Sequence, residues 1–574
     1  MRKYQVLVVL LLMMVSSCLT GNFFSQRAEA VSYQQLRQEN AGRTAKKMNF
    51  IPTTKQAVAF TFGGLSRQSS LQDILQRLDE NGMKGTFFVT ERELKRNADN
   101  VALIVSHGQE LGIGLRLDEK DDFYTICAQI DRIRTAIRDR YGVDTHVVRQ
   151  MYGAESPVAE EAVSALGCVL LGQTVNAVQS KHKNMTSADE IMPQIFGKWS
   201  TSLGRGQIVY IRTDFYAKDT LAGDVMMAIK QQKVDNIAYR TYDDSPENNP
   251  ANDSAYAITS AGNVLNDWDK RYEYPVDLKT VPGELQPGTV PVKITDQNFD
   301  KEFLKRYIGA PQVDEEDRML GFSRSEMTRA DKSGTVKTVT DNTVFLTFDD
   351  WGNDVSINKL LYVLRKHHVT GTFFIITWNM PNNPNLLRAI ALDGNEIGSH
   401  TNGHKAMAVR NAKNKQVPVL KPEEYAKDVT EAYRKLAETV GDVVVDGRHS
   451  LTRLMRPPTL AISKSGARAI MDAGYSYMVS GYESTEDYDA VSLSALVGAM
   501  QSGIYDEKGK VRRGSIIVMH MSSTAGYTPR ALDIMLTANE KRKDDDPRKF
   551  KIGRLSDYLV DGYSQMMKQA EPKK

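Results

Sequence analysis

The sequence predicts an α/β protein made of two similar units with parallel strands. Short runs rich in β-branched and aromatic residues, such as 344–348, alternate with longer stretches of helical spacing, such as 357–367. Strands that alternate with helices are typical of parallel sheets covered by helices. The chain has 574 residues, which is too long for one ordinary hydrophobic core, so we expect at least two domains.

Three segments occur twice at a constant interval. Segments that begin at positions 61, 85 and 108 have counterparts 286 residues later, at 347, 371 and 394. The first set reads T-F-G-G, G-T-F-F and G-Q-E-L-G, and the second reads T-F-D-D, G-T-F-F and G-N-E-I-G. A fixed interval across three segments indicates a duplicated unit. Only the second copy carries the paired acids.

The second unit shows an ordered series of elements. We expect strands at 344–348, 371–376 and 396–398, and helices at 357–367 and 386–392. An open sheet and a barrel both fit this series. In either architecture, functional groups lie at the carboxyl ends of the strands. Asp349, Asp350 and His400 all follow predicted strands at that end.

Turn-forming residues separate the two units. The first unit spans about 46–242, and the stretch 243–253 is dense in Asp, Asn, Ser and Pro, which predicts a linker. An irregular pattern with repeated prolines continues to 334, although 301–308 has the spacing of a short helix. The second unit begins at 335 and runs to 574. The sequence assigns no role to the segment 243–334.

Composition and charge exclude one class of partner. Apolar residues make up 41% and charged residues 25% of the chain, as in a globular protein, and the net charge is only +3. Basic and acidic residues are interleaved throughout, so we expect no nucleic-acid partner. The sequence indicates no oligomeric state.

The N-terminal segment 1–30 resembles a targeting signal. Arg2 and Lys3 precede an apolar run from 6 to 15. A lipobox-like V-S-S-C ending at Cys18 predicts a lipoprotein, whereas A-E-A at 28–30 fits signal peptidase cleavage. An uncleaved anchor over 6–24 is a weaker alternative, because polar residues interrupt it. All three place the chain outside the cytoplasm, with membrane contact only through this anchor or lipid.

Asp350, His400 and His404 form a candidate metal-binding triad. Two imidazoles at i and i+4 share one face if the segment after His400 turns helically. Two neutral imidazoles and one carboxylate suit zinc or a similar divalent ion, with one position left open for water. An open position is typical of a catalytic site rather than a structural one. One His-x-x-x-His pair alone does not decide between metal ligands and ordinary surface or core histidines.

Asp349 is the candidate general base. Its side chain points to the opposite face of an extended strand from that of Asp350, so it need not bind the metal. Helix capping is the alternative role, which Asn353 or Asp354 can fill instead. Arg456, ahead of a proline pair, can hold Asp349 through a bidentate contact, although an ordinary surface arginine is the simpler interpretation.

His520 and Asp487 are candidates for the acid side of the reaction. His520 ends an apolar strand, 515–521, where a histidine can act as a general acid. A buried core imidazole is the alternative. Asp487 can orient His520 through the other ring nitrogen.

The order of these motifs resembles the polysaccharide deacetylase family, also called the NodB-homology or carbohydrate esterase family 4 domain. The resemblance covers about 343–521, and more weakly about 58–213. T-F-D-D matches the family's base and first metal ligand, H-T-N-G-H at 400–404 its other ligands, Arg456-Pro457-Pro458 its R-x-P motif, and His520 its final histidine. Trp351 before Gly352, and Thr459 after the prolines, depart from the usual pattern and are expected to reshape the substrate groove.

The resemblance implies a fold and an activity. It implies two distorted (β/α) barrels, with 335–574 as the catalytic domain. It also implies metal-dependent removal of N-acetyl groups from a polysaccharide that contains N-acetylglucosamine, with Asp349 as base and His520 as acid. Peptidoglycan is the first candidate polymer, followed by poly-N-acetylglucosamine and chitin, and zinc the first candidate ion, before cobalt, nickel or iron. The alternatives are a metal hydrolase for another linear amide or for O-acetyl esters, and a non-catalytic glycan-binding protein.

The first copy lacks the chemical groups of the second. Gly63 and Gly64 stand where the second copy has its two aspartates, Gly114 and Asp118 where it has its histidines, and Arg212 in the place of His520. Arg149 is kept where Arg456 stands. We therefore expect 46–242 to be a degenerate, inactive domain that serves either in glycan binding or as a scaffold.

Overall fold

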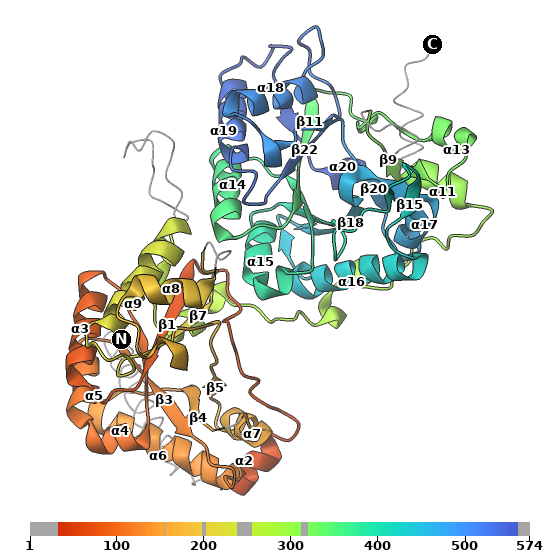
Figure 1. Ribbon diagram of the computed structural model, residues 1–574. Helices are drawn as coiled ribbons and strands as arrows, with labels where there is room; N and C mark the ends of the chain where they lie inside the picture. The colour runs from red at the N-terminus through yellow and green to blue at the C-terminus, as the bar shows by residue number, and fades with distance from the viewer. Residues whose placement is uncertain (1–31, 154, 198–201, 238–254, 312–318, 561–574) are drawn as a thin grey trace, which may run out of the picture. The chain divides into compact units, whose positions relative to one another are not determined.

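The computed structural model describes residues 32–153, 155–197, 202–237, 255–311 and 319–560, and it contains two curled parallel sheets with helices around them (Figure 1). This architecture confirms the predicted α/β class and the two distorted (β/α) barrels, each of which is a curled half-barrel sheet. The predicted bounds of the units, 46–242 and 335–574, stay predictions. The segment 1–30 and the turn-rich stretch 243–253 lie outside the described residues.

The first sheet has the strand order β5-β4-β3-β2-β1-β7-β6, and β8 also pairs with β1. Its strands are β1 (Ala57–Gly63), β2 (Thr86–Val89), β3 (Glu110–Arg116), β4 (Val147–Tyr152), β5 (Val169–Leu170), β6 (Val175–Asn176), β7 (Ile208–Arg212) and β8 (Ala257–Thr259). The accompanying helices are α2 (Tyr33–Glu39), α3 (Gln68–Glu80), α4 (Glu91–Arg96), α5 (Ala98–Ser106), α6 (Phe123–Tyr141), α7 (Pro157–Ala165), α8 (Ala188–Phe196) and α9 (Leu221–Ile229).

The second sheet has the order β21-β22-β11-β12-β13-β18-β20-β9, and β23 pairs with β11. Its strands are β9 (Tyr307–Ile308), β11 (Thr343–Asp350), β12 (Thr372–Ile375), β13 (Glu396–Ser399), β18 (Leu451–Met455), β20 (Tyr477–Val479), β21 (Glu483–Ser484), β22 (Ile516–His520) and β23 (Lys551–Ile552). The remaining helices are α10 (Ala261–Leu265), α11 (Phe299–Arg306), α13 (Arg324–Arg329), α14 (Asp354–Lys366), α15 (Pro384–Leu392), α16 (Pro422–Val440), α17 (Lys464–Asp472), α18 (Leu493–Ile504), α19 (Thr528–Glu540) and α20 (Leu555–Tyr558).

Three small two-stranded pairs complete the described strands. They are β10 (Met319–Leu320) with β19 (Ile462–Ser463), β14 (Ala408–Arg410) with β15 (Gln416–Pro418), and β16 (Val444–Val445) with β17 (Arg448–His449). The segment predicted as an irregular linker contributes to both large sheets, because β8 pairs with β1 and β9 pairs with β20.

The two copies repeat the same local hydrogen bonds, which explains the recurring sequence segments. Asn395 Oδ1 accepts a bond from the Gly371 N–H at 2.9 Å, as Gln109 Oε1 does from the Gly85 N–H at 2.8 Å. A Cβ at Gly371 would lie 2.6 Å from Phe348 Cε2, and one at Gly85 would lie 2.5 Å from a carbon of Phe62. The glycine of G-T-F-F is therefore needed for close packing against the neighbouring strand in both copies.

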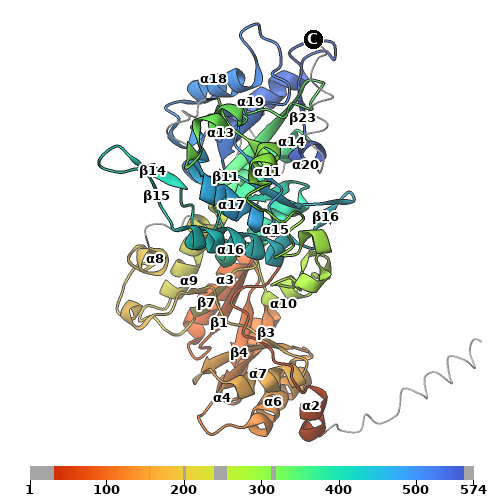
Figure 2. The same ribbon diagram turned by 90° about the vertical axis from the view of Figure 1, so that its right-hand side faces the viewer.

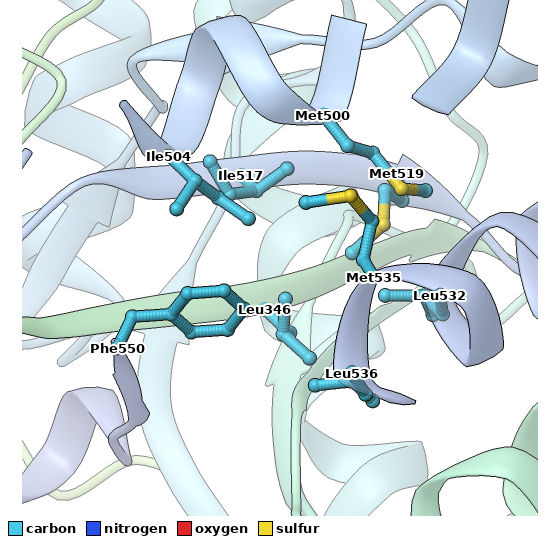
Figure 3. Close-up of a pocket in the computed structure, with 9 residues that line it drawn as sticks. All are labelled: Leu346, Met500, Ile504, Ile517, Met519, Leu532, Met535, Leu536 and Phe550. Carbon is cyan, nitrogen blue, oxygen red and sulfur yellow. The ribbon is translucent and has the colours of Figure 1, made fainter. Parts of the chain in front are cut away.

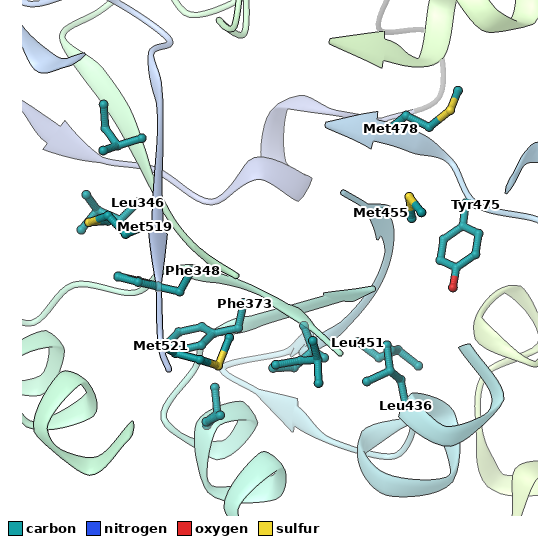
Figure 4. Packing of buried hydrophobic residues seen from close by; sticks show 14 of the residues in the cluster. Leu346, Phe348, Phe373, Leu436, Leu451, Met455, Tyr475, Met478, Met519 and Met521 are labelled. Carbon is teal, nitrogen blue, oxygen red and sulfur yellow. The ribbon is translucent and has the colours of Figure 1, made fainter. Parts of the chain in front are cut away.

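Large apolar side chains cover both faces of the second sheet. On the inner face, Phe345, Phe374 and Ile516 belong to one apolar cluster. Phe348 and Phe373 lie on the other face and pack ring against ring, with centroids 4.9 Å apart (Figure 4). On the outer face, side chains from β11 and β22 meet those of α18 and α19, with Leu346, Ile517 and Met535 pointing toward one another (Figure 3). Helices packed on the outside and apolar residues inside fix the strands whose carboxyl ends carry the polar groups.

A buried histidine joins α14 to α19. The His367 side chain is 2% exposed, and its two ring nitrogens lie 2.7 Å from Asp533 Oδ1 and 2.7 Å from Glu540 Oε1. Burial alone lowers the pKa of His367, but the hydrogen bonds to both carboxylates outweigh it and raise the pKa above the usual value. The protonated imidazole therefore ties the two helices together.

This contact predicts a pH-dependent stability. Because the folded-state pKa of His367 lies above the unfolded value of about 6.5, its stabilisation is complete below that pH and is lost as the pH rises through the folded pKa. We expect wild type to exceed His367→Gln in urea resistance at pH 6, with the difference shrinking at alkaline pH. A difference that stays constant from pH 6 to 9 would contradict this role.

Candidate active site

Three side chains at the carboxyl ends of β11 and β13 bring metal-ligating atoms together. Asp350 ends β11, and His400 and His404 lie in the loop after β13. One ligand atom of each lies within 4.8 Å of the others. His404 Nε2 is 3.5 Å and His400 Nε2 is 3.8 Å from Asp350 Oδ1. No other group of this kind is found among the residues that the structure describes.

The protonation of His400 suits a metal ligand. Its Nδ1 lies 2.8 Å from the carbonyl oxygen of Arg456, so this nitrogen carries the proton and Nε2 keeps a free lone pair. Burial lowers the pKa of His400, which keeps the imidazole neutral near pH 7. Two imidazoles and one carboxylate, with no fourth protein ligand in the group, fit a divalent ion at a catalytic site.

The loop after β13 is not helical, which corrects the expected reason for the pairing of the imidazoles. Thr401 and His404 have left-handed backbone angles, with φ of 65° and 51°, and Asp350 has φ of 81°. Such angles are strained for residues other than glycine and are concentrated at functional sites. Asp428 on α16 accepts a hydrogen bond from the Gly403 N–H at 2.9 Å. A fixed loop, rather than one face of a helix, therefore presents both histidines.

Asp349 lies beside this triad but is bound to a different partner. The side chain is buried, and Arg456, which is 0% exposed, donates from Nη1 to Asp349 Oδ1 at 2.7 Å and to Thr347 Oγ1 at 2.8 Å. The contact is therefore made through one nitrogen and is not the expected bidentate pair. The other guanidinium nitrogens donate to the carbonyls of Val479 and Ser480.

The same contact sets the charge of Asp349. Burial by itself raises the pKa of this carboxyl, but the guanidinium of Arg456 outweighs burial and holds the pKa below its usual value. The carboxylate is consequently ionised at neutral pH and can accept a proton. Asn353, whose side chain accepts from the Ser356 N–H at 3.1 Å, caps α14, which leaves Asp349 free of that role.

His520 and Asp487 form a hydrogen-bonded pair on the side of Asp349 opposite to His400. The register of β11 and β22 sets His520 next to Asp349. Asp487 is buried, with Oδ1 at 2.6 Å from His520 Nδ1 and Oδ2 accepting from the His520 backbone N–H at 2.9 Å. Burial lowers the pKa of His520, but Asp487 and the nearby carboxylates raise it above its usual value overall. The Tyr488 ring packs edge-on against the imidazole at 4.8 Å.

These groups open into one hollow of about 710 Å³ that includes Asp349, Asp350, His400, His404 and His520. Thr459, expected to reshape the groove, lines this hollow with a left-handed φ of 60°. Trp351, expected to do the same, packs against the hydrophobic core. The structure thus brings all seven predicted site residues together, because Arg456 and Asp487 lie directly behind Asp349 and His520.

Sequence reasoning missed two supporting residues. Thr347 accepts from Arg456 and donates to the Ile517 carbonyl at 2.6 Å. Its recurrence as Thr61, which makes the same bond to Val209 at 2.8 Å, was the available signal. Asp428 sits within an amphipathic helix, α16, where no local pattern distinguishes it from a solvent-facing acid.

The corresponding place in the first sheet is filled by an ion pair. The register of β1 and β7 sets Arg212 beside Gly63, as that of β11 and β22 sets His520 beside Asp349. Arg212 Nε lies 2.5 Å from Asp214 Oδ1, and a Cβ on Gly64 would lie 2.2 Å from that same oxygen. The ion pair therefore occupies the space that a counterpart of Asp350 would need.

The family model described as polysaccharide deacetylase matches residues 51–171 and 336–478. The peptidoglycan-N-acetylglucosamine deacetylase PgdA of Listeria monocytogenes is 24% identical over 259 residues, which cover 45% of this chain and 44% of that protein. A peptidoglycan-N-acetylglucosamine deacetylase of Bacillus cereus is 39% identical over 82 residues, covering 14% of this chain and 30% of its own. The match thus spans less than half the length of either relative.

Two solved structures are also similar. A family 4 acetyl xylan esterase from Clostridium thermocellum, in complex with a cobalt ion, is 21% identical, with a TM-score of 0.29 and coverage of 40% of this chain and 91% of that one. A CE4 family pseudoenzyme from Bacillus anthracis is 21% identical, with a TM-score of 0.31 and coverage of 38% and 66%.

Two regions of the chain match the polysaccharide deacetylase (NodB-homology, carbohydrate esterase 4) family, as the resemblance implied. The repeated strands agree with tandem copies of this domain. Within the parts of the chain that the structure covers, no helix has the length and apolar character needed to cross a bilayer. The predicted signal or anchor at 1–30 lies outside those parts.

Proposed function

We propose that the chain is a metal-dependent N-deacetylase that hydrolyses acetamido groups of a polymer containing N-acetylglucosamine. The observation that carries the proposal is the combination, in one hollow, of a three-residue ligand group with a separate buried carboxylate, Asp349, whose Oδ2 lies 3.9 Å from His400 Nε2. Region 335–574 is the catalytic domain and 46–242 an inactive copy. Peptidoglycan is the first candidate polymer, with poly-N-acetylglucosamine and chitin next.

Each side chain has a distinct task in this reaction. A divalent ion held by Asp350, His400 and His404 would supply Lewis acidity to the acetyl carbonyl and the attacking water. Asp349, ionised and held by Arg456, accepts the proton of that water. His520, positioned by Asp487, donates a proton to the departing amine. Zinc suits this ligand set best, and cobalt, nickel and iron accept the same donors.

We place this activity outside the cytoplasm. The support is the signal-like sequence at 1–30 and the naming of the relatives as peptidoglycan deacetylases. Acetate release from peptidoglycan, chitooligosaccharides and acetylxylan tests the substrate class. Release from acetylxylan alone would favour an O-acetyl esterase, and release from none would favour a glycan-binding protein.

Metal binding gives a direct test of the ligand group. We expect the wild-type chain to hold one divalent ion in the second domain, and His400→Ala or His404→Ala to weaken its binding by at least about 100-fold, since each removes one of three ligands. Elemental analysis after dialysis against a weak chelator measures this.

His449→Ala is the matched control for metal loss, because His449 lies on β17 rather than in the loop after β13. It should retain the ion. Wild-type protein that holds no ion after growth in zinc-supplemented medium would contradict the proposal.

The variant Asp487→Asn tests the role of His520 as the general acid. Replacing the carboxylate by an amide keeps a hydrogen-bond partner but removes the charge that raises the pKa of His520. Deprotonation of a general acid sets the alkaline limb of kcat/KM, so this limb should move to lower pH in the variant. Thr528→Val, which removes only the hydroxyl donor to Asp487, should shift it less. An unmoved limb in Asp487→Asn would exclude His520 as the titrating acid.

A further inference from the structure

A cationic hairpin adjoins the loop that carries His404. Between Glu396 and Glu423 the chain has no acidic residue. The same stretch holds five cations, all exposed: Lys405, Arg410, Lys413, Lys415 and Lys421. Strands β14 and β15 pair across its middle. Figure 2 shows this hairpin projecting outward beyond the helices near it.

The hairpin holds its charges in a defined turn. Asn411 Oδ1 accepts from the backbone N–H groups of Lys413 at 2.9 Å and of Lys415 at 3.1 Å, and Asn414 has a left-handed φ of 59°. None of the four lysines forms an ion pair with another described residue. Four lysines without an ion-pair partner among the described residues raise the local positive potential and attract anions.

A second hollow, of about 590 Å³, lies on the other side of the His404 loop. His404 lines the first hollow, whereas its two neighbours, Gly403 and Lys405, line the second. Trp378 lines it as well and is 66% exposed, and its backbone N–H donates to the Asn402 carbonyl at 3.0 Å. An exposed tryptophan fixed to a binding loop offers a flat apolar face, of the kind on which rings stack.

The second hollow has a lining of mixed charge, and the excess of positive charge lies on the adjoining hairpin. Glu431 accepts a hydrogen bond from the guanidinium of Arg434, whereas Asp428 and Glu424 accept only from the backbone N–H groups of Gly403 and Lys421 and keep their negative charge. Lys405 and Lys427 are exposed there. The first hollow is lined by two further carboxylates, Glu483 and Glu486. Negative groups on a bound strand are therefore favoured at the lysines of the hairpin rather than inside either hollow.

We propose that Trp378 and the cationic hairpin 405–421 form a second binding surface, which takes a glycan strand bearing carboxylate groups. A sugar ring stacks on Trp378, and the carboxylates of neighbouring sugars meet Lys413 and Lys415. The surface holds the polymer outside the hollow where the acetamido group reacts. This inference rests on the proposed deacetylase function for its biological use, but the surface itself is tested by binding alone.

The test compares two strands that differ only in charge. The probes are soluble strands of alternating N-acetylglucosamine and N-acetylmuramic acid, and the same strands with carboxylates reduced to alcohols. Lys413→Gln/Lys415→Gln should weaken binding of the charged strand roughly two- to tenfold at low salt, since exposed ion pairs are individually weak, and should leave the reduced strand unaffected. The difference should vanish at 0.5 M salt.

A matched control removes the same charge elsewhere. Lys508 and Lys510 are exposed in another turn, between the bridged residues Tyr505 and Val511, and Lys508→Gln/Lys510→Gln should bind both strands as wild type does. Trp378→Ala should weaken both strands. Equal loss for charged and reduced strands in the hairpin variant, equal loss in the control, or wild-type binding by Trp378→Ala would each overturn the surface.

Acetate release from neutral chitopentaose by wild-type protein separates the two proposals. If acetate is released but the hairpin variant keeps its affinity for the charged strand, the deacetylase function is supported and the second surface is refuted. If no acetate is released while the hairpin variant loses affinity for the charged strand alone, the second surface is supported and the deacetylase function is refuted. Poly-glutamate serves as a polyanion without sugars, and wild-type binding to it as tight as to the charged strand would refute the role of the sugar ring.

Discussion

Asp349→Asn is expected to lower kcat for acetate release by about 10³-fold, within the range for loss of a general base. An amide of the same shape keeps the contact with Arg456 but cannot accept a proton. Metal binding should persist, because the ligand group consists of Asp350, His400 and His404 and does not include Asp349. KM should change little, since this buried carboxylate acts on the attacking water.

Two measurements distinguish this outcome from general damage. Metal content of Asp349→Asn should match wild type within error, and circular dichroism should show a folded protein at the assay temperature, although urea resistance falls because the buried Arg456 loses its counter-charge. Asp489→Asn makes the same chemical change at an exposed position two residues from Asp487 and should keep a near-normal rate. If Asp349→Asn retains more than about a tenth of the wild-type kcat, another group removes the proton.

The parts of the fold that the sequence predicted are those with local signals. Strands β11, β12 and β13 and helices α14 and α15 all appear at the predicted places, because each combines a clear period with a turn or cap. Strand β9 was not predicted, because two residues carry no period and its pairing with β20 depends on tertiary contact. The predicted helix at 301–308 is real but begins and ends earlier, at Phe299–Arg306.

For the site as well, sequence motifs predicted some features and only the fold revealed the others. Asp349, Asp350, His400 and His404 follow strand ends, and ordered motifs identify them. The proline pair after Arg456 indicated this residue as the partner of Asp349, but only the fold reveals its complete burial and its four partners. The left-handed angles at Thr401 and His404 were equally hidden, because loop geometry follows from tertiary hydrogen bonds such as that of Asp428.

Arg456→Met is expected to lower the free energy of unfolding by about 3–5 kcal/mol at pH 7, as found when one partner of a buried ion pair is removed. Methionine has a similar length and is apolar, so the loss is mainly that of charge and hydrogen bonds. The variant leaves Asp349 buried without a counter-charge and two backbone carbonyls without their donor. Urea denaturation measures the change.

The pH dependence of that loss identifies its cause. In wild type the pKa of Asp349 is lowered, so the ion pair contributes stability above the unfolded pKa of about 3.9, and this contribution disappears as the pH falls through the folded pKa. Without Arg456, burial raises the pKa of Asp349. The destabilisation should therefore be largest near pH 7 and shrink toward pH 4, and Arg456→Met/Asp349→Asn should recover part of it at pH 7.

Arg453→Met is the matched comparison, because Arg453 lies on the same strand, β18, and donates to the carbonyls of Glu284, Gly474 and Gln286 but to no carboxylate. Replacing Arg453 should lower the free energy of unfolding by an amount that does not vary between pH 4 and 7. If Arg456→Met shows the same flat profile, the buried guanidinium holds the fold together through backbone carbonyls alone, and the ionised state of Asp349 needs another explanation. A loss confined to neutral pH would instead show that one arginine both stabilises the sheet and keeps the proton acceptor charged.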